Sequence, residues 1–66
     1  MSNIGNFLRK IRTEHNLSLA KLAEKSGVAD ITIMKWEKGE SSPNIDKLQK
    51  VIGALGYKMQ IVKTED

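Results

Sequence analysis

The feature that most restricts the fold of this chain is a glycine between two short stretches of helical spacing. Gly27 lies in the segment Ser26–Ala29, which separates apolar residues at positions 19–23 from those at positions 33–36. Glycine adopts the left-handed backbone that ends a helix without the penalty that a side chain would bring. We therefore expect two helices that are joined by a tight turn and meet at a steep angle, with Val28 packed between them.

Apolar residues that recur three and four positions apart predict the first two helices. One covers Ile4–Glu14 and is capped by Asn3. The next begins after Ser18, whose hydroxyl can accept hydrogen bonds from the first turn, and it ends at Gly27. The expected apolar stripes are Ile4, Phe7, Leu8 and Ile11 in the first helix and Leu19, Leu22 and Ala23 in the second.

The same spacing predicts a third helix that begins near Ala29 or Asp30 and ends at Gly39. An aspartate in the first turn complements the helix dipole. Ile33 and Trp36 are three positions apart, so we expect both to face inward. A polar loop over residues 40–43 follows.

A fourth helix is expected between Asn44, which is a good cap, and Gly56. Its predicted apolar face is Ile45, Leu48, Val51, Ile52 and Leu55. Gly53 lies inside this helix, where glycine costs up to about 1 kcal/mol relative to alanine, so we expect a close packing contact there. Together the patterns indicate an all-α domain of four helices over residues 1–56.

Residues 57–63 change to alternating apolar and polar positions, which is typical of a β-strand. The chain contains no second strand pattern, and a lone strand cannot satisfy its own backbone groups. Such a segment must pair with a strand of another molecule or be disordered. We expect a short C-terminal strand that pairs antiparallel with the same strand of a second copy. The dimer contacts would come from Tyr57, Met59, Ile61 and Val62. Residues 64–66 are expected to be a disordered end of the chain.

The chain is short and has no cysteine, which limits how it can be stabilised. Its 66 residues can hold one small domain, without a disulfide or a thiolate metal site. His15 is the single histidine, so we expect no metal. We also expect no cofactor and no catalytic residue, because no nucleophile–base pair or glycine-rich phosphate loop occurs. Tight helix packing or oligomerisation must supply the remaining stability.

Basic residues are concentrated in the first part of the chain, within a formal net charge of +3. Residues 1–38 contain seven Lys or Arg against four acidic residues, whereas residues 39–66 contain four of each. Charge alone favours an ordinary solvated surface over one that faces phosphates. No run of about 18 apolar residues and no signal-peptide pattern occurs, so we expect a cytoplasmic protein without a membrane partner.

The stretch from Leu17 to Gly39, with the residues after it, resembles the lambda-repressor-like (Cro/Xre-type) helix-turn-helix family. The resemblance covers roughly residues 6–56. It is carried by Leu17-Ser18, Leu22-Ala23-Glu24, Ser26-Gly27-Val28, Ile33, Lys35-Trp36-Glu37-Lys38-Gly39, Pro43, Leu48, Val51, Ala54, Leu55 and Gly56. The resemblance implies a protein of the bacterial cytoplasm, or of a phage-infected host, that places its third helix in the major groove of DNA.

The resemblance assigns base contacts to the first part of the third helix. The residues are Ala29, Asp30, Ile31, Thr32 and Lys35, with Met34 beside them. Lys35 can donate to guanine, Asp30 can accept from cytosine N4, and Ile31 can pack on a thymine methyl group. Two alternatives remain open: Asp30 only complements the helix dipole, and Lys35 contacts a phosphate instead of a base.

Phosphate contacts are implied at the start of the second helix and in the loop after the third. The candidates are Ser18, Leu19, Lys38, Gly39, Ser41, Ser42 and Asn44. The family usually has glutamine where this chain has Leu19, so a backbone N–H contact remains there and the side-chain contact is lost. The resemblance also implies an ion pair between Arg12 and Glu37 that holds the first helix against the third.

The function that the resemblance implies is sequence-specific regulation of transcription. A homodimer would bind a palindromic operator in double-stranded DNA and act as a repressor. The alternative is an antitoxin, which holds a toxin protein and represses its own operon, because a strand after four helices is similar to several antitoxins. A helical bundle that binds only protein is the remaining alternative, and an enzyme is not expected.

Overall fold

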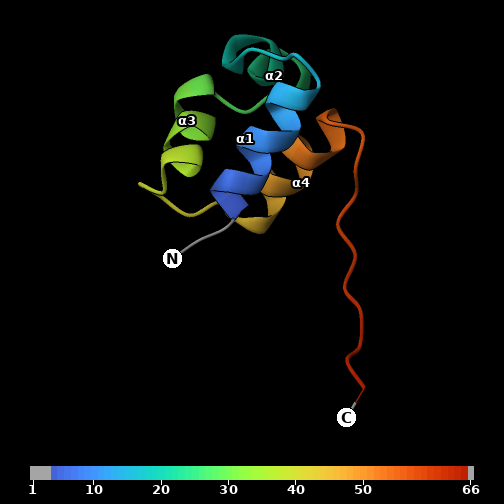
Figure 1. Ribbon diagram of the computed structural model, residues 1–66. Coiled ribbons are helices and arrows are strands. Elements are labelled where there is room, and N and C mark those ends of the chain that lie inside the picture. The colour runs from blue at the N-terminus through green and yellow to red at the C-terminus, as the bar shows by residue number, and fades with distance from the viewer. Residues whose placement is uncertain (1–3, 66) are drawn as a thin grey trace.

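The computed structural model describes residues 4–65, which form four helices followed by an extended C-terminal segment (Figure 1). The helices are α1 (Ile4–Glu14), α2 (Leu19–Ser26), α3 (Asp30–Lys38) and α4 (Ile45–Ala54). These bounds agree with the predicted helices, and the all-α class is confirmed. The predicted cap Asn3 and the C-terminal Asp66 lie outside the described residues.

Side-chain caps and a left-handed glycine mark several helix ends, as the sequence predicts, whereas α3 begins without a side-chain cap. Ser18 Oγ accepts a hydrogen bond from the amide of Lys21 at 3.0 Å, at the start of α2. Asn44 Oδ1 accepts one from the amide of Lys47 at 2.8 Å, at the start of α4. Gly27 ends α2 with a φ of 77°, which is the left-handed conformation that the turn between α2 and α3 needs.

The core lies where the four helices meet. α1 packs on α3, and α2 packs on both α3 and α4. Each helix contributes one fully buried side chain, and these are Leu8, Leu22, Ile33 and Val51. Val28 in the turn and Trp36 in α3 are buried beside them, as expected. Burial of this apolar surface is the main term that stabilises such a small domain.

The backbones of α1 and α3 come close together at Gly5. A Cβ atom at this position would meet the carbonyl oxygen of Trp36 and would lie 3.2 Å from the Cα atom of Glu37. The missing side chain therefore sets the distance between the two helices. The close contact that we expected at Gly53 is wrong, because a Cβ atom there would have no neighbour within 4 Å.

Two residues of the predicted apolar stripes are exposed. Phe7 is 45% exposed, because it lies about 100° around α1 from the buried Leu8 and so falls at the edge of the stripe. Ile45 is 59% exposed, because it is the first residue of α4 and precedes the turns that pack on α2. The apolar spacing was correct for the middle of each helix and wrong at these two positions.

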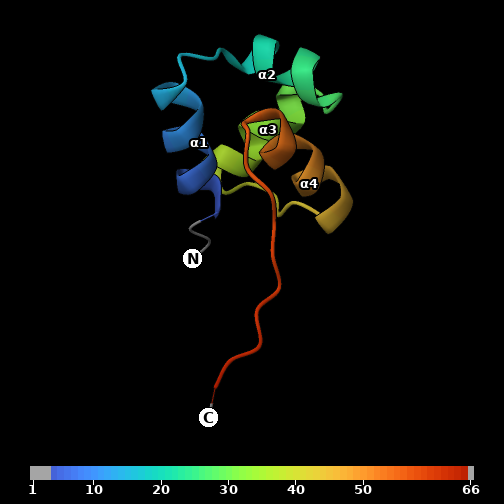
Figure 2. The same ribbon diagram turned by 90° about the vertical axis from the view of Figure 1, so that its right-hand side faces the viewer.

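Residues 57–65 leave the domain after α4 as an extended segment, which we call the tail (Figures 1 and 2). The amide of Tyr57 donates to the carbonyl of Ile52 at 3.0 Å, and its ring meets that of His15 edge-on, with centroids 6.2 Å apart. Ile61 further along is fully exposed. No β-strand forms within residues 4–65, because the helical domain offers the tail no strand edge.

Candidate nucleic-acid interface

α3 presents one side to the core and the opposite side to solvent. Ile33 and Trp36 anchor the inner side and are almost completely buried. Asp30, Ile31 and Lys35 are exposed on the outer side. Ile31 and Lys35 are four positions apart, so they lie next to each other on one face of the helix. The domain thus holds a short helix rigidly while leaving a continuous face free for a partner.

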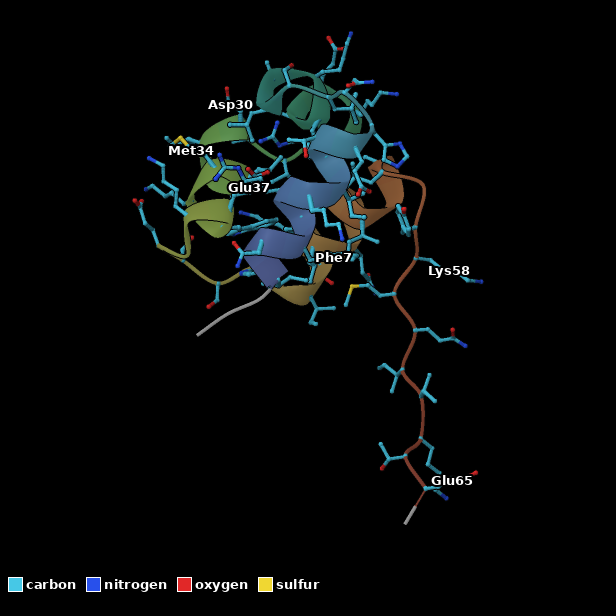
Figure 3. All side chains as sticks on the ribbon, viewed as in Figure 1. Phe7, Asp30, Met34, Glu37, Lys58 and Glu65 are labelled. Atoms are coloured by element: carbon cyan, nitrogen blue, oxygen red, sulfur yellow. The ribbon has the colours of Figure 1, made fainter. Side chains whose placement is uncertain are left out.

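This outer face combines charged residues with an apolar one. The apolar residue is Ile31, whose side chain is 51% exposed. Figure 3 shows Asp30 and Met34 on the outer side of α3, on the opposite side of the molecule from the tail. A face with a donor, an acceptor and an apolar group can match the edges of bases in the major groove.

The structure brings most of the predicted base-contacting residues to one place. Ala29 immediately precedes α3 and is exposed, like the first two residues of the helix. Thr32, in contrast, is half-buried. Lys35 extends the exposed run by one turn.

The predicted phosphate-contacting residues lie in two groups, at the start of α2 and around the loop after α3. Six of them are exposed: Ser18, Lys38, Gly39, Ser41, Ser42 and Asn44. Leu19 differs, because it is half-buried and its side chain packs against the core. An apolar side chain at this position therefore supports the start of α2 from inside the domain.

Arg12 and Glu37 form the predicted ion pair between α1 and α3. Arg12 donates from Nε to Glu37 Oε2 at 2.7 Å and from Nη2 to Glu37 Oε1 at 2.9 Å. Its Nη1 donates to the carbonyl of Leu17, just before α2, at 2.9 Å. The hydrogen bond to Glu37 raises the pKa of Arg12 and outweighs the opposite effect of burial, so the guanidinium stays charged.

No group of three His, Cys, Asp or Glu side chains within residues 4–65 is placed to hold a metal ion. None of the helices in this part of the chain is long and apolar enough to cross a membrane.

α2 and α3, joined by the turn around Gly27 and supported by α1 and α4, define a helix-turn-helix domain. The chain belongs to the helix-turn-helix family HTH_3, whose sequence profile matches residues 8–62. The resemblance that the sequence shows to Cro/Xre-type proteins is therefore confirmed. This is a family of DNA-binding transcriptional regulators and not of enzymes.

Similar proteins carry this domain as part of longer chains. A crystal structure of an HTH_3-family transcriptional regulator from Vibrio cholerae matches with a TM-score of 0.83 and 37% identity, over 86% of this chain and 32% of that one. Uncharacterized HTH-type transcriptional regulators from two strains of Mycobacterium tuberculosis are 33% identical over 58 residues, which is 88% of this chain and 41% of theirs. The immunity repressor protein of Bacillus phage phi105 is 29% identical over 63 residues, 96% of this chain and 44% of its own. The chain spans less than half the length of each relative.

Proposed function

We propose that this protein is a transcriptional repressor that binds a specific palindromic sequence in double-stranded DNA as a homodimer. The observation that carries the proposal is the exposed outer face of α3, held in place by the buried Ile33 and Trp36. Membership of the HTH_3 family supports DNA binding, and one relative is itself named as a repressor. Repression would follow from occupation of the operator, which keeps RNA polymerase from the same DNA.

In this proposal, residues 29–35 lie in the major groove. Lys35 donates to guanine O6 or N7, Asp30 accepts from cytosine N4, and Ile31 packs on a thymine methyl group. Ala29 packs on a thymine methyl group as well, and Thr32 contributes its hydroxyl at the edge of the interface. The combination of a cation, an anion and an apolar side chain on one face supports recognition of bases over simple attraction to phosphates.

The backbone of the DNA would be held at both sides of α3. The N-terminus of α2, at Ser18 and Leu19, offers amide groups and the positive end of the helix dipole to one phosphate. The end of α3 and the loop after it offer a cation, a backbone amide and short polar side chains to another. The residues are Lys38, which is the last residue of α3, and then Gly39, Ser41, Ser42 and Asn44, all exposed. Such contacts fix the position of α3 without distinguishing one sequence from another.

The dimer would form through the tail. A single DNA-binding module buries only about 600–1,000 Å² on DNA, so a second copy on a palindrome adds both affinity and specificity. Tyr57, Met59, Ile61 and Val62 are all exposed apolar side chains in the single chain, and antiparallel pairing with a second tail would pack them partly against their counterparts across the two strands. The tail and the outer face of α3 lie on opposite sides of the domain, so pairing leaves both α3 helices free (Figure 3).

The proposal is tested by selecting bound sequences from random DNA and then comparing two lysine variants on the selected duplex. Lys35→Ala should weaken binding at least about tenfold and relax the preference at one base pair, because a base contact is worth about 1–3 kcal/mol. Lys50→Ala, on α4, removes the same charge away from α3 and should leave the preference unchanged. Equal effects of the two substitutions would contradict the proposed role of α3.

A further inference from the structure

A hollow beside α3 is lined by charged residues, and one of them, Arg9, has no role in the contacts described above. It has a volume of about 200 Å³ and lies between α1, the start of α2 and the outer side of α3. Its lining residues are Arg9, Arg12, Leu19, Met34, Glu37 and Lys38. Three of them are basic and one is acidic, so the hollow carries a net positive charge, while Leu19 and Met34 supply an apolar surface.

Arg12 is not available to bind a partner in this hollow. Three of its N–H groups already donate to Glu37 and to the carbonyl of Leu17, and the Glu37 carboxylate balances its charge. Arg9 and Lys38 are different, because both are exposed and neither forms an ion pair within residues 4–65. Two uncompensated cations from different helices therefore line one concave surface.

The packing of α1 on α3 explains why Arg9 reaches this place. Arg9 follows Gly5 by four positions, so both lie on the face of α1 that touches α3. The close approach at Gly5 brings this face against the backbone of Trp36 and carries Arg9 to the flank of α3. Lys38 follows Met34 by four positions and so extends the outer side of α3 towards the same flank.

We propose that Arg9 and Lys38 together bind one backbone phosphate of the DNA at the edge of the major groove. This inference rests on the proposed function of α3. The major groove is about 12 Å wide and admits a single helix, so groups that flank α3 meet the sugar–phosphate backbone and not the bases. An arginine fork matches the geometry of phosphate oxygens, and the apolar surface of Leu19 and Met34 reduces the screening of the charges by water.

The test compares Arg9→Gln with Lys10→Gln, which removes the same charge from the neighbouring exposed position of α1. Binding of each variant to the selected duplex and to a scrambled duplex is measured between about 50 and 200 mM salt. Arg9→Gln should weaken binding to both duplexes by the same factor, about tenfold, and reduce the slope of log K against log salt by about 1. Lys10→Gln should leave the slope unchanged, and Arg9→Lys should restore it.

A neutral methylphosphonate, placed in turn at single positions of the selected duplex, locates the contact. At one position near the edge of the site, this change should weaken binding by the wild type more than binding by Arg9→Gln or Lys38→Gln, because each substitution already removes part of the same interaction. Equal slopes for Arg9→Gln and Lys10→Gln, with wild-type binding still specific, would overturn the inference alone. A wild type without sequence preference would overturn the proposed function first.

Discussion

Arg12 of α1 and Glu37 of α3 share two parallel hydrogen bonds, of 2.7 and 2.9 Å, with side chains that are only 13% and 5% exposed. The same guanidinium bonds the carbonyl of Leu17, so one side chain connects α1, α3 and the segment that leads into α2. A pair that is largely removed from water depends on both members, because either charge alone would be left without compensation.

Replacement of Arg12 by methionine should therefore lower the free energy of unfolding by about 3 kcal/mol, measured by urea denaturation. Methionine keeps the apolar stem in place, so the loss of stability reports the removal of the charge and its hydrogen bonds. The double variant Arg12→Met, Glu37→Met should be less destabilised than the sum of the single variants, because it leaves no unpaired charge. Unchanged stability and unchanged DNA affinity of Arg12→Met would show that the pair has no structural role.

Two glycines that look equivalent in the sequence should respond to alanine in opposite directions. Gly5→Ala places a methyl group against the carbonyl of Trp36 and should destabilise the domain by about 1–3 kcal/mol, because the two helix backbones must move apart. Gly53→Ala meets no neighbour and should stabilise the domain by up to about 1 kcal/mol through helix propensity. Thermal unfolding of both variants checks the signs, and a neutral or stabilising Gly5→Ala would refute the close approach.

If the tails form the dimer, removal of residues 57–66 should convert the protein to a monomer. Sedimentation equilibrium measures this change. A two-fold axis through a pair of antiparallel strands places one residue opposite its own copy. We expect this residue to be Ile61, which is the most exposed of the large apolar residues of the tail. A truncated chain that stays dimeric would contradict this role of the tail.

Because the chain has no cysteine, single substitutions can report the register of the paired tails. Ile61→Cys should form an intermolecular disulfide readily, whereas Lys58→Cys and Glu65→Cys should not, because only the first brings the two Cα atoms within about 7 Å. Uniform cross-linking at all three positions would contradict an ordered pair of strands. A full-length protein that is monomeric at all concentrations would leave the tail free for another protein, as the antitoxin alternative requires.

Ile31 offers a test that separates base contact from folding. Its side chain is half-exposed, so Ile31→Ala should leave thermal stability nearly unchanged. Binding to the selected duplex should fall by about 1 kcal/mol, because a contact with a thymine methyl group is lost. Replacement of that thymine by uracil should weaken the wild type and leave Ile31→Ala unaffected. A variant that loses stability and affinity together would instead place Ile31 in the fold.

The sequence was sufficient to predict all four helices, because several helix ends carry a local signal. Ser18 and Asn44 cap their helices with side-chain oxygens, and Gly27 adopts the left-handed backbone that ends α2. These are interactions between residues within a few positions of each other. The pairing of Arg12 with Glu37, 25 positions apart, came only from the resemblance to the family.

The features that the sequence did not reveal depend on how the helices cross. Gly5 and Gly53 are both helical glycines, and only the packing of α1 on α3 shows that the first is required and the second is not. Phe7 has the spacing of a core residue but falls just outside the contact. Arg9 is one of several exposed cations, and only the hollow beside α3 distinguishes it from Lys10.

The most direct test of the central claim is the affinity of the wild-type protein for its selected palindrome relative to a scrambled duplex of the same length and composition, at one fixed salt concentration. Recognition of bases by α3 predicts a ratio of about 10³ or more. A ratio near 1 would mean that the protein binds DNA only through its charge, and the account of α3 as the recognition helix would be wrong.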